Sequence, residues 1–90
     1  MRVLLITYTL RNQSKDYSGL FNAIKTHTGW WWHYFETVWI VQSNSTADQL
    51  AKQLYSYIEN GDHLLVVRLH KDYQGWLPKD AWDWLNARHY

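Results

Sequence analysis

Hydrophobic residues in this chain form either continuous runs of strand length or stretches with helical spacing. The continuous runs Val3–Tyr8 and Leu64–Leu69 are typical of strands that are covered on both faces. Two further segments, Trp30–Tyr34 and Thr37–Val41, are rich in aromatic and β-branched residues, which favour strands. We therefore predict four strands, with the middle two joined by a tight turn around Phe35–Glu36.

The first predicted helix lies between the first two strands. Asp16 is suited to cap its N-terminus, and an apolar stripe follows at three- and four-residue spacings. The stripe consists of Tyr17, Leu20, Phe21 and Ile24. We expect this helix to end near His27–Gly29, where the glycine permits a left-handed C-terminal cap.

Two more helices are predicted in the second half of the chain. Thr46 and Gln49 have the spacing of a capping box, and the helix that they begin should stop at Asn60–Gly61. Its apolar stripe is Ala47, Leu50, Ala51, Leu54 and Ile58. Pro78 at a first turn begins a short C-terminal helix, whose apolar residues are Ala81, Trp82 and Leu85.

The order of these elements predicts an α+β fold. Strand, helix, strand, strand, helix, strand is the ferredoxin-like βαββαβ arrangement, an antiparallel sheet with two helices on one face. Its usual strand order is 4-1-3-2, and the short C-terminal helix is an addition to it. A chain of 90 residues has room for one such domain, so residues 1–90 are expected to form a single unit.

Both the first and last strands are apolar on both faces, yet two helices cover only one face of a sheet. The open face is therefore expected to meet a second subunit, a partner or the C-terminal helix. Of these, a homodimer through the open sheet face is our prediction.

Composition narrows the function classes further. The chain has no cysteine, which excludes disulfides, thiolate zinc sites and cysteine nucleophiles. Its apolar runs are much shorter than the ~20 residues of a membrane span, so a cytoplasmic location without a membrane partner is expected.

The net charge of +1 neither indicates nor excludes a nucleic-acid partner. Seven Trp and seven Tyr among sixteen aromatic residues are typical of a large-residue core, an interface or a base-stacking platform.

Several segments together resemble a group of short bacterial proteins known as SinR-like, and the chain is similar to the CRISPR-associated adaptation protein family. The segments are Leu5–Leu10, Lys15–Ser18, Trp31–Tyr34, Thr37–Trp39, Asp62–Val66, Trp76–Pro78 and Trp84–Leu85. The resemblance covers nearly the whole chain. It implies a dimeric ferredoxin-like fold that acts either as a metal-dependent nuclease or as a non-catalytic scaffold that holds DNA.

The nuclease members of that family are expected to place an aspartate just after the aromatic residue that ends the first strand, where it and its dimer mate hold Mg²⁺. The matching position here is Thr9. A neutral hydroxyl lacks the charge that Mg²⁺ prefers in its ligands. The chain is therefore predicted to be non-catalytic, with no cofactor, and Mg²⁺ enters only if the nuclease alternative holds.

Other residues remain candidates for that alternative. An antiparallel sheet brings Asp62 and His63 toward Thr9, with Asp16 at the foot of the following helix. The simpler interpretation is that Asp16 caps a helix and Asp62 occupies a turn. The five histidines, at positions 27, 33, 63, 70 and 89, have no zinc-site spacing, and no Gly-rich phosphate loop or nucleophile elbow occurs.

Nucleic acid is the remaining partner class. Arg11 and Lys15 in one loop, with Lys71 after the last strand, are candidates for phosphate contacts, although scattered cations are more often a solvated surface. A third hypothesis is a single-stranded RNA binder that stacks bases on Trp or Tyr. The segment Thr37–Val41 lacks the basic and glycine residues of an RNA-recognition strand, so this hypothesis ranks below the dimeric module and the nuclease.

Overall fold

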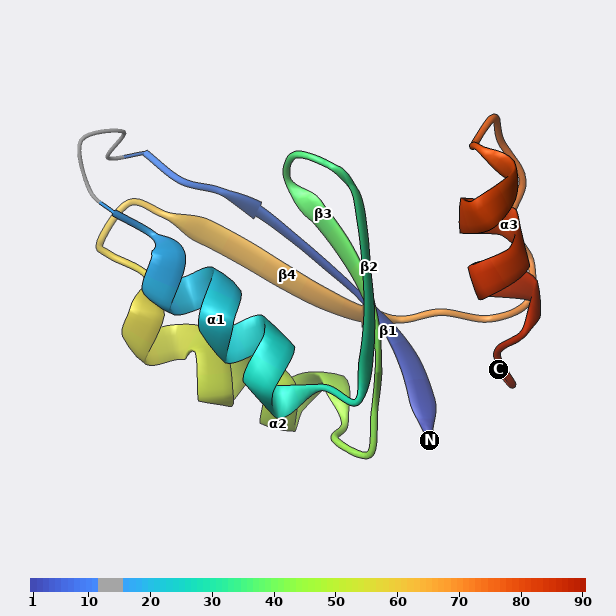
Figure 1. Cartoon of the computed structure of the whole chain (residues 1–90). Helices are drawn as coiled ribbons and strands as arrows, with labels where there is room; N and C mark the ends of the chain where they lie inside the picture. The colour runs from blue at the N-terminus through green and yellow to red at the C-terminus, as the bar shows by residue number, and fades with distance from the viewer. Residues whose placement is uncertain (12–15) are drawn as a thin grey trace.

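Four antiparallel strands form one sheet, with α-helices on both of its faces (Figure 1). The computed structural model describes residues 1–11 and 16–90. In chain order the elements are β1 (Arg2–Thr9), α1 (Ser18–His27), β2 (Trp30–Phe35), β3 (Val38–Ser43), α2 (Ala47–Leu54), the 3-10 helix η1 (Tyr55–Tyr57), β4 (His63–Arg68) and α3 (Lys79–Asn86). Among the described residues, no helix has the length and apolar character needed to cross a membrane.

The strand order is β2-β3-β1-β4, so β1 lies at the centre of the sheet. The first and last strands are neighbours, as the sequence predicted. Leu5 of β1 lies opposite Ile40 of β3 and Val67 of β4. Because successive residues of a strand point to opposite faces, this register assigns each side chain of the three strands to one face.

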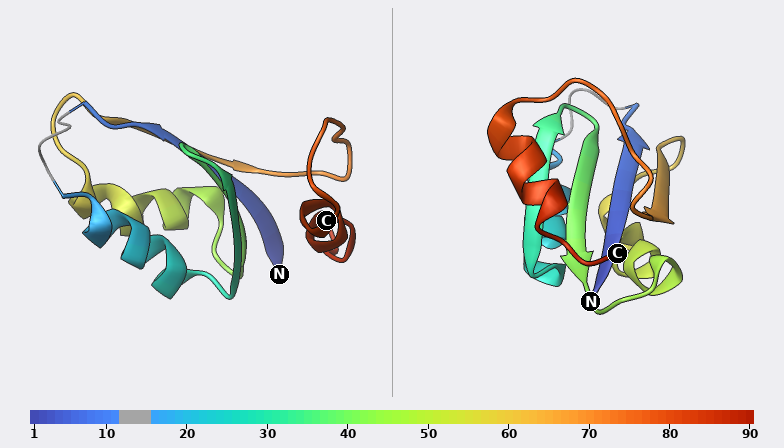
Figure 2. Two further views of the ribbon diagram at one scale, coloured as in Figure 1. Left: turned by 45° about the horizontal axis from the view of Figure 1, so that its top comes forward. Right: turned by 90° about the vertical axis from the view of Figure 1, so that its right-hand side faces the viewer.

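One face of the sheet is covered by α1 and α2 (Figures 1 and 2). Its core combines alternate residues of β1 and β3 with the apolar stripes of both helices; the buried members are Leu4, Ile6, Tyr8, Tyr17, Leu20, Ala23, Ile24, Trp39, Val41, Leu50 and Leu54. The prediction that Leu54 is a core residue is confirmed, because its side chain is fully buried. The predicted capping box is also present, since Thr46 and Gln49 exchange side-chain to backbone hydrogen bonds.

The opposite face is partly covered by the chain's own C-terminal segment. After β4 the chain crosses the sheet and α3 returns over β2 and β3 (Figure 2). Ala81 and Leu85 of α3 pack against Val3, Trp32 and Ile40. The C-terminal helix therefore supplies part of the cover for which the sequence analysis favoured a second subunit.

The predicted left-handed cap at Gly29 is wrong. The only residue with positive φ among those described is Gly61. α1 ends at His27, and its C-cap residue Thr28 is extended. The Thr28 hydroxyl donates a hydrogen bond to the carbonyl of Ile24 at 2.7 Å, and Gly29 N–H donates to Gln42 O at 2.9 Å. The chain passes directly from the helix into strand pairing, which requires extended backbone.

The second helix is shorter than predicted. Its α-helical part ends at Leu54 and continues as η1, and Ile58 then adopts an extended conformation. The predicted stop at Gly61 corresponds to a turn, in which Asp62 N–H donates to Glu59 O at 3.0 Å. Gly61 has a φ of 94°, a conformation that residues with a Cβ rarely adopt. Ile58, the last residue of the predicted apolar stripe, therefore lies outside the helix.

Candidate functional site

The sheet brings the predicted polar residues at the end of β1 together in part. Thr9, the last residue of β1, lies directly opposite His63, the first residue of β4. Both side chains are exposed, and as an opposed pair they lie on the same face of the sheet. The expectation that the start of the last strand lies beside Thr9 is confirmed.

Asp62 is turned into the protein rather than toward Thr9. This buried carboxylate accepts hydrogen bonds from Arg11 N–H at 2.8 Å, from the Tyr17 hydroxyl at 2.9 Å and from Glu59 N–H at 2.8 Å. These bonds join the end of β1, the start of α1 and the turn before β4. Asp62 therefore stabilises the junction of three segments, which agrees with its interpretation as a turn residue.

Asp16 is exposed and acts at the start of α1. Its Oδ1 accepts a hydrogen bond from Ser18 N–H at 2.9 Å. This bond to the charged form lowers the pKa of the Asp16 carboxyl below its ordinary value. Asp16 is not the N-cap that the sequence predicted, because Tyr17 occupies that position and α1 begins at Ser18. Asp16 lies one residue before the cap and accepts from the first N–H of the helix.

A metal centre is not assembled from these side chains. In the part of the chain that the structure describes, no group of three or more His, Asp or Glu side chains is arranged to hold a metal ion. The site at the end of β1 thus consists of a hydroxyl, an imidazole and a carboxylate that already accepts hydrogen bonds from Arg11, Tyr17 and Glu59.

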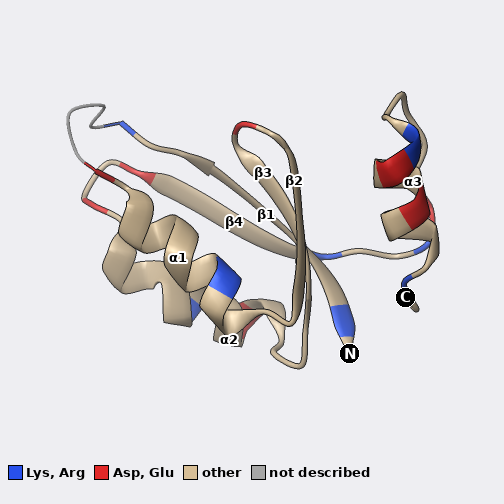
Figure 3. Ribbon diagram, viewed as in Figure 1, with Lys and Arg blue, Asp and Glu red and all other residues tan. Residues whose placement is uncertain are grey.

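The predicted phosphate contacts do not form one patch. Arg11 follows the C-terminal end of β1 and Lys71 follows the C-terminal end of β4, and these antiparallel strands place the two residues at opposite ends of the sheet. Lys and Arg positions are scattered along the whole ribbon (Figure 3). Lys15 lies outside the described residues.

A further candidate surface is apolar and lies on the part of the sheet that α3 leaves open. We call this surface the uncovered sheet face and define it by Leu5, Phe35, Val38, Leu65 and Val67. None of these five side chains belongs to the two buried clusters formed by the described residues. Leu65 is 57% exposed, Phe35 52% and Val67 40%.

Strand pairing makes this surface continuous. Thr7 of β1 connects Leu65 of β4 to Val38 of β3, and Phe35 of β2 lies opposite Val38. The next row runs from Val67 through Leu5 to the covered part of the sheet. Thr9 and His63 provide a polar border at the end of this surface. An apolar centre with a polar border is typical of a protein interface.

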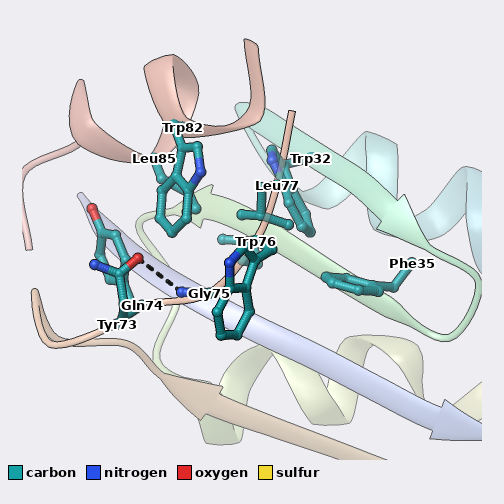
Figure 4. Close-up of a pocket in the computed structure, with 10 residues that line it drawn as sticks. Trp32, Phe35, Tyr73, Gln74, Gly75, Trp76, Leu77, Trp82 and Leu85 are labelled. Carbon is teal, nitrogen blue, oxygen red and sulfur yellow. Dashed lines mark hydrogen bonds between the residues drawn. The ribbon is translucent and has the colours of Figure 1, made fainter. Parts of the chain in front are cut away.

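A pocket lies where the uncovered sheet face meets the C-terminal segment (Figure 4). Its volume is about 170 Å³. The lining residues come from β2, β3, the segment before α3 and α3 itself; they are Trp32, Phe35, Ile40, Tyr73, Gln74, Gly75, Trp76, Leu77, Trp82 and Leu85. Trp76 is 98% exposed. Sequence reasoning missed this pocket, and the only available signal was an apolar Trp76 in a segment expected to be a loop.

Cations accompany two tryptophans at the β2 edge of the sheet. The Lys25 ammonium lies 4.9 Å from the centre of the Trp31 ring, and the Arg88 guanidinium lies 5.6 Å from that of Trp30. Arg88 also stacks on Trp84 at 4.7 Å and donates to Gln42 Oε1 at 2.9 Å. The contacts of Arg88 hold the end of the C-terminal segment against β2 and β3.

Comparison with known proteins places this chain in no family. No protein-family model matches it, and no curated protein matches its sequence. The residues and their geometry therefore carry the functional argument.

Proposed function

We propose that this chain is a non-catalytic dimeric module of ferredoxin-like fold, in which two copies meet through the uncovered sheet face. The observation that carries the proposal is the set of exposed apolar side chains on this face of strands β4 and β2, namely Leu65, Val67 and Phe35. A continuous apolar patch on the face of a sheet is rarely left bare in a monomer, because it costs free energy in water.

The ferredoxin-like assignment is supported by the topology. From the β4 edge the strand order is β4-β1-β3-β2, and α1 and α2 lie on the same face (Figure 1). This is the order and layering expected of a βαββαβ chain. α3 is then an addition that covers only one part of the opposite face.

The non-catalytic character is supported by the end of β1. Thr9 supplies a hydroxyl where the resembling nucleases are expected to have a metal-binding aspartate. The carboxylate of Asp62, which precedes the residue paired with Thr9, is engaged by two backbone N–H groups and the Tyr17 hydroxyl. If Asp62 bound a metal ion instead, the fold would lose the hydrogen bonds that join the end of β1, the start of α1 and the turn before β4. A nuclease that uses Asp62 would therefore be a less stable protein.

The dimer is tested by measuring the molar mass in solution by light scattering at high micromolar concentration. We expect twice the mass of one chain for the natural protein and the mass of one chain for Leu65→Asp, because the charge would be buried in the interface without a partner. Tyr55→Asp is the matched control, since Tyr55 is an exposed apolar residue on η1 and this variant should remain dimeric. A single-chain mass for the natural protein would refute the proposal.

Single-stranded nucleic-acid binding is a second candidate, favoured by one observation. Trp30 and Trp31 are exposed on the edge strand β2, and each has a cation near its ring. Aromatic rings with neighbouring cations can stack bases and contact phosphates. Fluorescence anisotropy with labelled single-stranded RNA tests this candidate: Trp31→Ala should weaken binding, whereas Tyr55→Ala should not. Absence of binding by the natural protein at low salt would exclude it.

A further inference from the structure

Trp76 is the most exposed large apolar side chain that the structure describes, at 98%. It lies in the segment that connects β4 to α3. Tryptophan is highly buried on average in folded proteins, because contact between its large apolar ring and water is unfavourable. In protein interfaces, tryptophan is one of the residue types that contribute most to the binding free energy. An indole that the fold leaves in water is therefore a candidate anchor for a protein contact.

The residues around Trp76 hold it in this exposed position. Leu77 and Tyr73 pack against the buried cluster that α3 forms with the sheet, and the Tyr73 hydroxyl donates to Asn86 Oδ1 at 2.9 Å. Pro78 is the residue that directly precedes α3, and proline restricts both its own backbone and that of the residue before it. The exposure of Trp76 thus belongs to the folded segment, because residues on both sides of it are packed or restrained.

The open pocket beside Trp76 can accept an indole ring. Trp76 borders this pocket together with Phe35 of β2 and Leu85 of α3, and Figure 4 shows Trp76 at the side opposite α3. None of the described lining residues is charged, so the pocket suits a neutral, apolar occupant. Its volume is about 170 Å³, and an apolar cavity of roughly 150 Å³ can hold benzene. The six-membered ring of one indole therefore fits.

The Trp76 ring of the same chain does not fill this pocket, since almost all of its surface is exposed to water. Ring and pocket are thus complementary features that lie side by side on one surface. Phe35 belongs both to the pocket and to the uncovered sheet face, so they are continuous with the surface proposed as the dimer interface. A two-fold axis makes every contact between two copies twice, in both directions. An axis that passes between ring and pocket therefore places each ring in the pocket of the opposite copy.

We propose that Trp76 anchors the homodimer by inserting its ring into this pocket of a second copy, while the partner's Trp76 enters the pocket of the first. This inference rests on the proposed dimer and names the residue that contributes most to its affinity. A stable interface buries about 800 Å² on each partner, and an aromatic side chain buries about 150 to 250 Å². One inserted indole therefore supplies a substantial part of the area that a dimer needs.

The first test measures the dissociation constant of the dimer by sedimentation equilibrium. Trp76→Ala should raise this constant by about 100-fold or more, because each dimer loses two inserted rings and an interface anchor contributes about 10-fold or more. Tyr55→Ala is the matched control. Tyr55 is an exposed aromatic residue on η1 and does not line the pocket, so this variant should dimerise as the natural protein does.

A mixing experiment tests whether the ring enters the pocket of the opposite copy. Leu77→Phe keeps Trp76 but adds bulk to the pocket lining, so its homodimer should also be weak. A heterodimer of Trp76→Ala with Leu77→Phe retains one insertion, that of the remaining indole into the unblocked pocket. Fluorescence anisotropy should therefore show that labelled Trp76→Ala binds unlabelled Leu77→Phe about 10-fold more tightly than it binds unlabelled Trp76→Ala.

Gly75→Leu is a second variant that should block the pocket. Gly75 lines the pocket, and a Cβ at this position would meet no heavy atom within 4 Å beyond its chain neighbours, so the fold should accept the larger residue. Its homodimer should be weak, and Trp76→Ala should bind it as tightly as it binds Leu77→Phe. The mixing experiment thus stays decisive even if Leu77→Phe fails to fold.

The outcomes separate this inference from the dimer proposal. A single-chain mass for the natural protein would refute both. A dimer that Leu65→Asp dissociates but that Trp76→Ala leaves equally tight would refute the anchor alone. If Trp76→Ala binds neither blocked variant more tightly than it binds itself, the ring does not enter the opposite pocket and the inference is wrong.

Discussion

The Tyr17 hydroxyl donates a hydrogen bond to Asp62 Oδ2 at 2.9 Å, across 45 positions of sequence. Both side chains are buried, and the bond ties the start of α1 to the turn that precedes β4. The same carboxylate accepts from the backbone of Arg11, just after β1. The Asp62 carboxylate, a candidate metal ligand in the nuclease alternative, is thus part of the framework of the fold.

Replacing Asp62 with alanine should destabilise the protein. The change leaves buried donors without their acceptor, which typically costs about 1 to 3 kcal/mol. Urea unfolding measures this loss, with Asp72→Ala as the control because Asp72 is exposed in the loop after β4. Equal stability of the natural protein and Asp62→Ala would contradict the structural role of this carboxylate.

Leu54→Ala should lower the free energy of unfolding by about 2 to 5 kcal/mol, since it opens a cavity in a packed core. Leu54 is fully buried in the cluster beneath α1 and α2. Gln53→Ala, at an exposed position of the same helix, should have a small effect. A loss below ~1 kcal/mol for Leu54→Ala, the scale of a surface change, would mean that the helix packs through another face.

Tyr8→Phe should destabilise the protein at neutral pH by about 1 to 3 kcal/mol, because it removes the acceptor of a buried donor. The Tyr8 hydroxyl accepts from Trp39 Nε1 at 3.0 Å and donates to Glu36 O at 3.1 Å. Phenylalanine keeps the ring in the core and removes only these bonds.

The same variant should alter the response to alkaline pH. Burial raises the pKa of the Tyr8 phenol above its ordinary value of 10.0, an effect opposed in part by the bond from Trp39. The contribution of Tyr8 to stability is therefore complete below pH 10 and is lost as the pH rises through the higher folded pKa. The difference in unfolding free energy between natural protein and Tyr8→Phe should shrink above pH 10, and a constant difference would refute this assignment.

The natural protein should show no Mg²⁺- or Mn²⁺-dependent cleavage of RNA or DNA above background. Thr9 adds no negative charge to a site whose affinity for a hard cation depends on its carboxylates. The measurement compares natural protein and Thr9→Asp on single- and double-stranded substrates, with and without EDTA. EDTA-sensitive cleavage by the natural protein that Asp16→Ala abolishes would replace the non-catalytic proposal with the nuclease alternative. Asp62→Ala supports that reading only if circular dichroism shows that the variant remains folded.

Local chemistry made several features predictable from the sequence. The capping box of Thr46 and Gln49 requires only the spacing of two residues, and the unbroken apolar run of β1 correctly indicated an interior strand. The same pattern in β4 was misleading, because β4 is an edge strand and leaves Leu65 and Val67 exposed on one face. The neighbouring positions of Thr9 and His63 followed from the order of elements, because an antiparallel pair of strands brings the end of one to the start of the other.

Features that depend on distant segments were decided by tertiary structure. Gly29 allowed a left-handed cap, but its pairing with Gln42 required extended backbone, and the turn at Gly61 shortened the helix before it.

The open face of the sheet shows the same division. The apolar residues of β1 and β4 predicted that the face needs a cover. Only the folded chain shows that α3 covers one part, leaves Leu65 and Val67 exposed, and borders an open pocket beside Trp32. Sequence determines which side chains avoid water, because that preference belongs to each residue. Which surfaces meet depends on the path of the whole chain, because contacts between distant residues form only when the packing of all the elements is satisfied together.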